Sequence, residues 1–206
     1  MQGLNPLHFA TMVVRPVLKG MAEVTERKSL YSKAAERLVL GTAIQESRLI
    51  SLRQLAHRDG RRGPALGLYQ IEPATHRDVW ENYARFRPEI VHFLQQLVPW
   101  HEGSLQVAEE GAVGQPIIFG WPKDNLLVWN LAYATAIARL VYYRAPAPLP
   151  RANDLEGLAR YWKRYYNTTQ GAGEGAEFVK AYEENTPPGV FAGDFKAAWT
   201  QARKKR

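Results

Sequence analysis

One glutamate interrupts an otherwise apolar helical face, and it is the residue of this chain that most suggests chemistry. A carboxylate in such a face loses hydration, and desolvation raises the pKa of a carboxyl group. A glutamate with a raised pKa can act as a general acid near neutral pH. The alternative is a structural glutamate that reaches water or pairs with an arginine such as Arg48. The residues spaced by three and four along this face are Ala35, Leu38, Val39, Thr42, Glu46 and Leu49.

A tight turn from Gly67 to Ile71 is the second feature with chemical potential. Gly67 permits a positive φ or a close approach of two backbones. Gln70 stands among apolar and aromatic neighbours, so its amide would offer two donors and one acceptor in fixed positions. That arrangement suits a ligand that carries amides or hydroxyls. The alternative is that Gln70 ties the backbone of its own loop together.

Three short motifs follow one another in an order that is specific as a set. They are Glu46-Ser47, then Gly67-Leu68-Tyr69-Gln70-Ile71 with Ala74-Thr75, then Tyr165-Tyr166-Asn167 ahead of Gly171 and Gly173. From about Ser32 to Tyr182 the chain resembles the soluble lytic transglycosylase family, whose members share the goose-type lysozyme fold. The family motifs are Glu-Ser, Gly-Leu-Met-Gln-Ile and Tyr-Asn-x-Gly-x-Gly. This chain departs from them at Tyr69, in place of the methionine, and by two extra residues before the last glycines.

The resemblance implies an enzyme that cuts the β-1,4 bond between N-acetylmuramic acid and N-acetylglucosamine in peptidoglycan glycan strands. Glu46 would be its single catalytic residue, first as general acid and then as general base, and the product would be a 1,6-anhydro sugar. No cofactor and no metal is implied. The residues that the resemblance implies for substrate binding are Ser47, Gly67, Tyr69, Gln70, Ile71, Tyr166 and Asn167.

Two other functions stay open on the same fold. An inverting muramidase would need a second carboxylate about 6.5–9.5 Å from the first to activate water. The acids that we consider for that role are Asp59, Glu72, Asp78 and Asp124. A catalytically silent structural protein is the other possibility, because a fold does not fix a function.

The expected setting is a bacteriophage virion. We recognise no secretory signal at the N-terminus, where Arg15 and Pro16 interrupt the apolar run. A helical N-terminal extension and a long insertion accompany the resemblance and suit a virion part. We therefore expect a protein that contacts other virion proteins and acts on the cell wall, in the periplasm of the host.

The composition is that of a globular protein and limits the chemistry that the chain can perform. The 206 residues suffice for one domain with appendages, and 46% hydrophobic and 23% charged residues are an ordinary globular balance. The absence of cysteine excludes disulfides and thiol nucleophiles, and none of the five histidines stands at a metal-binding spacing. The net charge of +7 favours an anionic partner. No nucleic-acid motif accompanies the basic residues, so we expect no specific nucleic-acid partner.

We expect a mostly α fold: a lysozyme-like helical domain over 32–186 with an insertion at about 86–122. A helical extension over 1–31 precedes it, divided or kinked at Pro16, and a C-terminal helix with a basic tail follows over 187–206. The helix that carries Glu46 is expected to run from Ser32, its N-cap, to Ile50.

Two further helices are expected around the site. Asp154 would cap a helix whose end delivers Tyr166 and Asn167. The apolar stretch 126–143 contains Arg139, and an arginine at the centre of a bilayer costs about 2.5–3.5 kcal/mol. We interpret this stretch as one long helix buried in the protein core, not as a membrane span.

Overall fold

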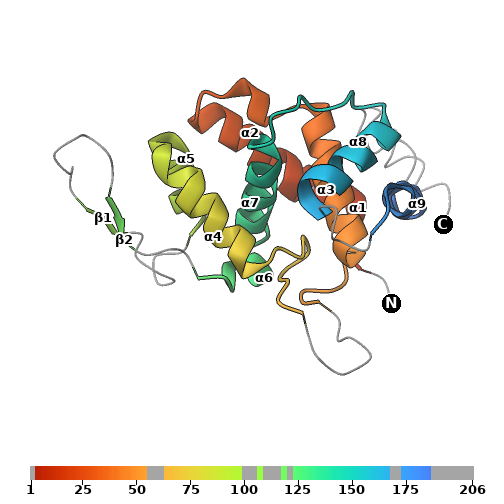
Figure 1. The fold of residues 1–206 in the computed structure, drawn as a ribbon, viewed down its shortest axis with the longest axis horizontal. Coiled ribbons are helices and arrows are strands. Elements are labelled where there is room, and N and C mark those ends of the chain that lie inside the picture. Colours follow the sequence, from red (N-terminus) through yellow and green to blue (C-terminus); the bar gives the residue numbers. More distant parts are fainter. Residues whose placement is uncertain are drawn as a thin grey trace.

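The computed structural model describes residues 3–54, 63–98, 106–108, 117–119, 123–167 and 173–186, with the backbone alone at 106–108 and 117–119. In these ranges the chain is mostly helical (Figure 1), which confirms the expected all-α character. Two short antiparallel strands, β1 and β2, pair Gln106 with Phe119. The elements are α1 (Pro6–Phe9), α2 (Arg15–Val24), α3 (Lys33–Ser47), α4 (Pro73–Asn82), α5 (Pro88–Leu97), β1 (Gln106–Ala108), β2 (Ile117–Phe119), α6 (Leu126–Trp129), α7 (Leu131–Tyr143), α8 (Leu155–Trp162) and α9 (Gly175–Asn185).

Helix α3 lies among the other helices and forms the centre of the core. It contacts α1, α7, α8 and α9 (Figure 1). Side chains around its whole circumference are buried, including Leu38, Leu40 and Ile44, which are fully covered. A helix that is covered on all sides belongs to the core of a domain. Gly41 allows the close approach of α9, because a Cβ at that position would collide with the ring of Phe178.

The two ends of α3 are set by local chemistry. The Ser32 side chain accepts a hydrogen bond from the Ala35 N–H at 3.0 Å, which confirms the expected N-cap. The helix ends at Ser47 and not at Ile50, because Arg48 and Leu49 both adopt left-handed backbone with φ of 53° and 56°. Glu46 therefore lies in the last turn of the helix.

The N-terminal segment packs into the same hydrophobic core as α3. Between α1 and α2 the helix continues as a π-helical turn, Ala10–Val14, in which the Arg15 N–H donates to the Ala10 carbonyl, and Pro16 follows without breaking the helix. Phe9, Leu18 and Met21 are buried. The segment is thus part of the packing around α3, and the proposed boundary near residue 31 stays a prediction.

The apolar stretch 126–143 is two helices and not the one long helix that we expected. Asn130 leaves the helical conformation between α6 and α7, with φ of −96° and ψ of 89°. Its side chain accepts from the Tyr133 N–H at 2.9 Å and donates to the Leu97 carbonyl at 2.7 Å. The asparagine is therefore the cap of α7. No helix in the described ranges combines the length and the apolar character that a membrane crossing demands.

A buried chain of hydrogen bonds holds α4 against α7. His76 Nδ1 lies 2.7 Å from Asp124 Oδ1, and its Nε2 lies 2.7 Å from the Tyr133 hydroxyl. The Trp80 N–H also donates to that hydroxyl, at 2.8 Å. Because the Asp124 carboxylate can only accept, the proton of neutral His76 lies on Nδ1, and Nε2 accepts from the Tyr133 O–H. Burial lowers the pKa of His76, which fits this neutral form.

Part of the expected architecture lies outside the described residues. This holds for the C-terminal helix and basic tail over 187–206 and for much of the insertion at about 86–122. Helix α5 is the described helix of the insertion, and its Ile90, Phe93 and Leu94 are buried. Those side chains join the hydrophobic core that surrounds α3 and α7.

Candidate active site

Three segments that are distant in sequence meet at the C-terminal end of α3. The first is the last turn of α3, which carries Glu46. The second is the turn from Leu66 to Ile71, and the third is the end of α8, which continues as a π-helical turn over Lys163–Asn167. Such π-helical turns redirect side chains and are frequent at functional sites.

Two hydrogen bonds connect these segments. The Trp162 N–H, at the end of α8, donates to Glu46 Oε1 at 3.0 Å. The Tyr166 hydroxyl donates to the Tyr69 carbonyl at 2.7 Å. The first bond joins α8 to α3, and the second joins the π-helical turn to the second motif. The structure thus brings together all three motifs that the sequence singled out.

Glu46 is half-buried and has the properties of a general acid. Burial raises its pKa from the ordinary 4.5 to about 7, and the hydrogen bond from Trp162 opposes that shift. Because Oε1 is held by the indole, a proton on the neutral carboxyl would lie on Oε2. Within the described residues Oε2 has no hydrogen-bond partner. It is therefore free to donate to a ligand.

The turn from Leu66 to Ile71 has a constrained backbone. Leu66 and Ile71 form an antiparallel bridge with N–H to carbonyl distances of 3.0 and 2.9 Å. Gly67 has a φ of 70°, and a Cβ there would collide with the Leu127 carbonyl. Gln70 is also left-handed, with a φ of 48°. A residue other than glycine in this conformation stores strain, which is typical of functional turns.

The Gln70 side chain uses part of its hydrogen-bonding capacity inside the turn. Its Nε2 donates to the Gly67 carbonyl at 2.7 Å, which supports the alternative that Gln70 ties its own loop together. One amide hydrogen and the amide oxygen remain without a partner in the part of the chain described. The side chain is half-buried, so these two groups stay available to a ligand.

Three residues that the resemblance implies for substrate binding have their side chains in the interior. Ser47 Oγ donates to the Ala43 carbonyl at 2.9 Å and accepts from the Leu49 N–H at 3.2 Å. The Tyr69 hydroxyl lies 2.9 Å from Thr135 Oγ1, and Ile71 is 2% exposed. The tyrosine at the family's methionine position is thus a core residue with a polar partner. Direct contact of these three residues with substrate stays a prediction.

Tyr166 and Asn167 are half-buried in the π-helical turn at the end of α8. The Tyr166 ring stacks on Tyr142 with centroids 5.2 Å apart, and the Tyr142 hydroxyl lies 2.6 Å from Thr42 Oγ1. Burial raises the pKa of both tyrosines, and Glu46 lies close enough for its negative charge to add to that effect. Asn167 Oδ1 accepts from Lys163 Nζ at 3.1 Å.

Sequence reasoning missed two residues of the site, Trp162 and Tyr142. Trp162 precedes Tyr166 by one helical turn, so a search of the same helix face would have found it. Tyr142 gives no such local signal, because α7 reaches the site only through tertiary packing. Gly173 contributes by its small size, since a Cβ there would lie 2.8 Å from the Trp162 ring.

No second carboxylate among the described residues is hydrogen-bonded to Glu46. Asp78 accepts from Arg144 and Asn82, each at 2.6 Å, and Asp124 is paired with His76. Glu72 is exposed at the start of α4, and Asp59 lies outside the described residues. In the ranges described, no three side chains of the metal-binding types lie close enough to hold an ion.

Comparison with known proteins returned no match to a family model, to a curated protein or to a solved structure. The functional argument therefore depends on the residues of the site and on the motifs that they form.

Proposed function

We propose that this chain is a lytic transglycosylase of peptidoglycan on a lysozyme-like fold, with Glu46 as the acid and base. The observation that carries the proposal is the state of this carboxyl group. It has a pKa near 7, it is held at Oε1 by Trp162, and it lies where the three motifs meet. The matching order of motifs in sequence supports the same proposal.

The chemistry needs one carboxyl group. Glu46 Oε2 donates its proton to the glycosidic oxygen as the bond from that oxygen to muramyl C1 breaks. The carboxylate that results then accepts the proton of the muramyl C6 hydroxyl, while O6 forms a bond with C1. The products are a free C4 hydroxyl and a 1,6-anhydro sugar, and Glu46 is again protonated. A pKa near 7 allows both transfers at neutral pH.

A single acid favours this route over hydrolysis with inversion. Inversion requires a second carboxylate that is free to activate water, whereas among the described candidates Asp78 and Asp124 are each hydrogen-bonded and Glu72 is exposed at the start of α4. A virion-associated role, in which the protein opens the wall of the host during infection, belongs to the same proposal and is supported by sequence features alone.

A zymogram with purified peptidoglycan tests the proposal. Glu46→Gln keeps an acceptor for the Trp162 N–H but removes the proton donor, so we expect about 100- to 10,000-fold less clearing. Glu72→Gln is the matched control, because it removes an exposed acid beside the second motif, and we expect it to clear like the wild type. Equal clearing by wild type and Glu46→Gln would refute the proposal.

Mass spectrometry of the digest separates the remaining mechanisms. Anhydro ends on the released glycans are expected from a transglycosylase. Reducing ends, together with a loss of activity in Glu72→Gln, would mean an inverting muramidase. A folded wild-type protein that releases no glycan at all would mean a silent structural protein.

A further inference from the structure

Arg139 in α7 is a buried cation without an acidic partner among the described residues. The residue is 2% exposed. Its Nε donates to the Leu30 carbonyl and its Nη2 to the Ser29 carbonyl, both at 2.9 Å. Burial lowers its pKa to about 10, and the groups that oppose this shift are tyrosines. Buried charges are usually paired with an opposite charge, so this one is unusual.

A surface pocket of about 490 Å³ opens beside this guanidinium. It lies between the end of α7, the proline-rich connector 145–149 and residues 29–32. The volume falls in the range of small-molecule sites, about 300–1,000 Å³. In the part of the chain that the structure describes, no acidic residue lines the pocket, and most of its walls are aromatic, proline and small apolar side chains. The polar side chains of the lining are Ser29, Ser32, Arg139, Tyr142, Tyr143 and Tyr161.

Several hydrogen-bond donors of the lining remain available. A guanidinium has five N–H groups, and Arg139 spends two of them on the carbonyls of Ser29 and Leu30. Ser32 Oγ accepts from the backbone of α3, so its own hydrogen is free. Ser29 Oγ and the Tyr143 hydroxyl lie 2.7 Å apart and share one hydrogen bond. That bond uses one of the two hydroxyl hydrogens, so the other can donate to a ligand. The pocket therefore presents positive charge and spare donors, with no negative charge to balance them.

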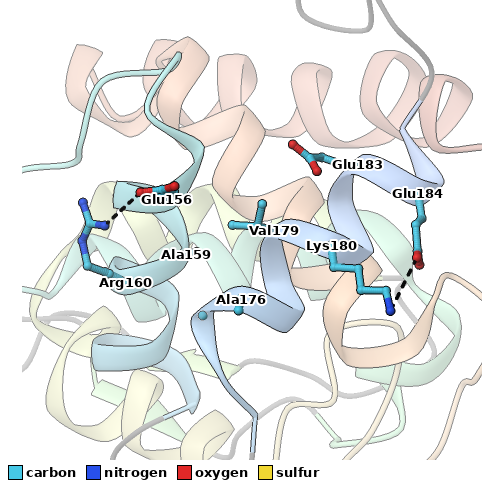
Figure 2. A pocket seen from close by; sticks show the side chains of 9 residues that line it. Glu156, Ala159, Arg160, Ala176, Val179, Lys180, Glu183 and Glu184 are labelled. Atoms are coloured by element: carbon cyan, nitrogen blue, oxygen red, sulfur yellow. Dashed lines mark ion pairs between the residues drawn. The ribbon is translucent and has the colours of Figure 1, made fainter.

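In a second pocket, the hollow between α8 and α9, the basic side chains are paired with acids. It has a volume of about 550 Å³ and is floored by small residues such as Ala159 and Ala176 (Figure 2). Its cations lie opposite acids, Arg160 at 3.7 Å from Glu156 and Lys180 at 3.9 Å from Glu184. Because each basic group faces an acid of its own helix and Glu183 adds a further acid, this hollow has no unbalanced positive charge to offer an anion.

We propose that the pocket beside Arg139 binds an oxyanion, a carboxylate or a phosphate, carried on a small apolar or aromatic body. The guanidinium and the hydroxyl donors would hold the anion, and the tyrosines and prolines would cover the body. The pocket is too large for a bare ion, which is why we infer an organic anion. The proposal is independent of the reaction assigned to Glu46.

Nuclear magnetic resonance tests the proposal through the Nε–H signal of Arg139. The ligands are benzoate, phenyl phosphate and neutral benzamide, added at constant ionic strength to the full chain. We expect benzoate or phenyl phosphate, or both, to shift the signal with a Kd in the millimolar range or tighter, and the stronger of the two identifies the anion. No shift with either anion, or an equal shift with benzamide, would overturn the proposal.

Two variants at Ser32 supply a matched pair of controls. Asp and Asn cap a helix about as well as Ser does, so both variants preserve the start of α3. Ser32→Asp puts a carboxylate into the pocket and is expected to weaken anion binding at least about tenfold, because like charges repel. Ser32→Asn adds similar volume and an amide donor but no charge, so it should bind the anion at least about tenfold more tightly than Ser32→Asp does. Equal binding by the two variants, or loss of binding in both, would contradict the proposal.

Discussion

Helix α3 carries one glutamate near each end, Glu36 fully buried and Glu46 half-buried, and the two have opposite kinds of partner. Near the N-terminal end, Glu36 is fully buried and bound to Arg15, whose Nη2 lies 2.6 Å from Oε1 and whose Nε lies 3.0 Å from both carboxylate oxygens. The Tyr31 hydroxyl adds a third donor at 3.2 Å. Near the C-terminal end, Glu46 has one donor, Trp162, and no cationic partner within the described ranges.

The difference shows how partners decide the role of a buried carboxyl group. A carboxylate that is paired with a guanidinium and saturated with hydrogen bonds is a structural ion pair, and it links α2 to α3. A carboxyl group that is buried without a cation retains its proton to higher pH and can transfer it. Both residues are glutamates of the same helix, so residue type and helical periodicity alone do not separate the two roles.

Removal of the paired acid should have the largest effect on stability. Glu36→Gln leaves the Arg15 guanidinium without its counter-charge, and breaking a buried pair in this way costs about 3–5 kcal/mol in the free energy of unfolding. Urea unfolding at pH 8 measures this loss. The control is Glu46→Gln, which should not lower the stability at that pH. A loss below about 1 kcal/mol in Glu36→Gln would show that the pair is not structural.

Removal of the unpaired acid should change the pH dependence of stability. The pKa of Glu46 is raised from 4.5 to about 7, so the folded state binds this proton more tightly than the unfolded state does. The resulting stabilisation is fully present below pH 4.5 and is lost as the pH rises through 7. At 1.36 kcal/mol for each pKa unit, the difference in stability between wild type and Glu46→Gln should change by about 3 kcal/mol in favour of Gln. Parallel stability curves from pH 4 to pH 8 would exclude this account.

Loss of the indole donor should raise the pKa of Glu46 further. The Trp162 N–H lowers the pKa of Glu46, so Trp162→Phe should raise that pKa by about one unit or less, the energy of one hydrogen bond. The upper limit of the pH range for glycan cleavage should move in the same direction. Rates measured from pH 5 to pH 9 test this, and a shift to lower pH would rule out the proposed role of the indole.

The smallest effect is expected from two glycines near the indole. A Cβ at Gly173 would lie 2.8 Å from the Trp162 ring, so Gly173→Ala must move the ring and should cost about 1 kcal/mol. At Gly175 the nearest atom would be 3.8 Å away, an ordinary contact, so Gly175→Ala should be neutral. Thermal unfolding compares them, and an equal change in both variants would argue against close packing on Trp162.

Local signals predicted much of the helical framework. The Ser32 cap of α3 and the Asp154 cap of α8, which accepts from the Gly157 N–H at 2.7 Å, are both confirmed. The ends of elements were harder to predict. No glycine marks the end of α3, where Arg48 and Leu49 turn left-handed, and Asn130 divides the stretch 126–143 by a tertiary bond to Leu97.

The site could be predicted only in part, for a physical reason. The motifs around Glu46, Gln70 and Tyr166 gave its position in the sequence. The partner of each acid comes from another helix, Arg15 from α2 and Trp162 from α8, and such pairs depend on packing that no local pattern encodes. For this reason the sequence around Glu36 does not indicate that this glutamate forms an ion pair.

The most direct test of the central claim is the titration of the Glu46 carboxyl carbon by ¹³C nuclear magnetic resonance, with Glu46→Gln used to assign the signal. The account predicts a midpoint near pH 7. A midpoint close to 4.5 would mean that this carboxyl group is ionised at neutral pH, and it would contradict the role of Glu46 as a proton donor.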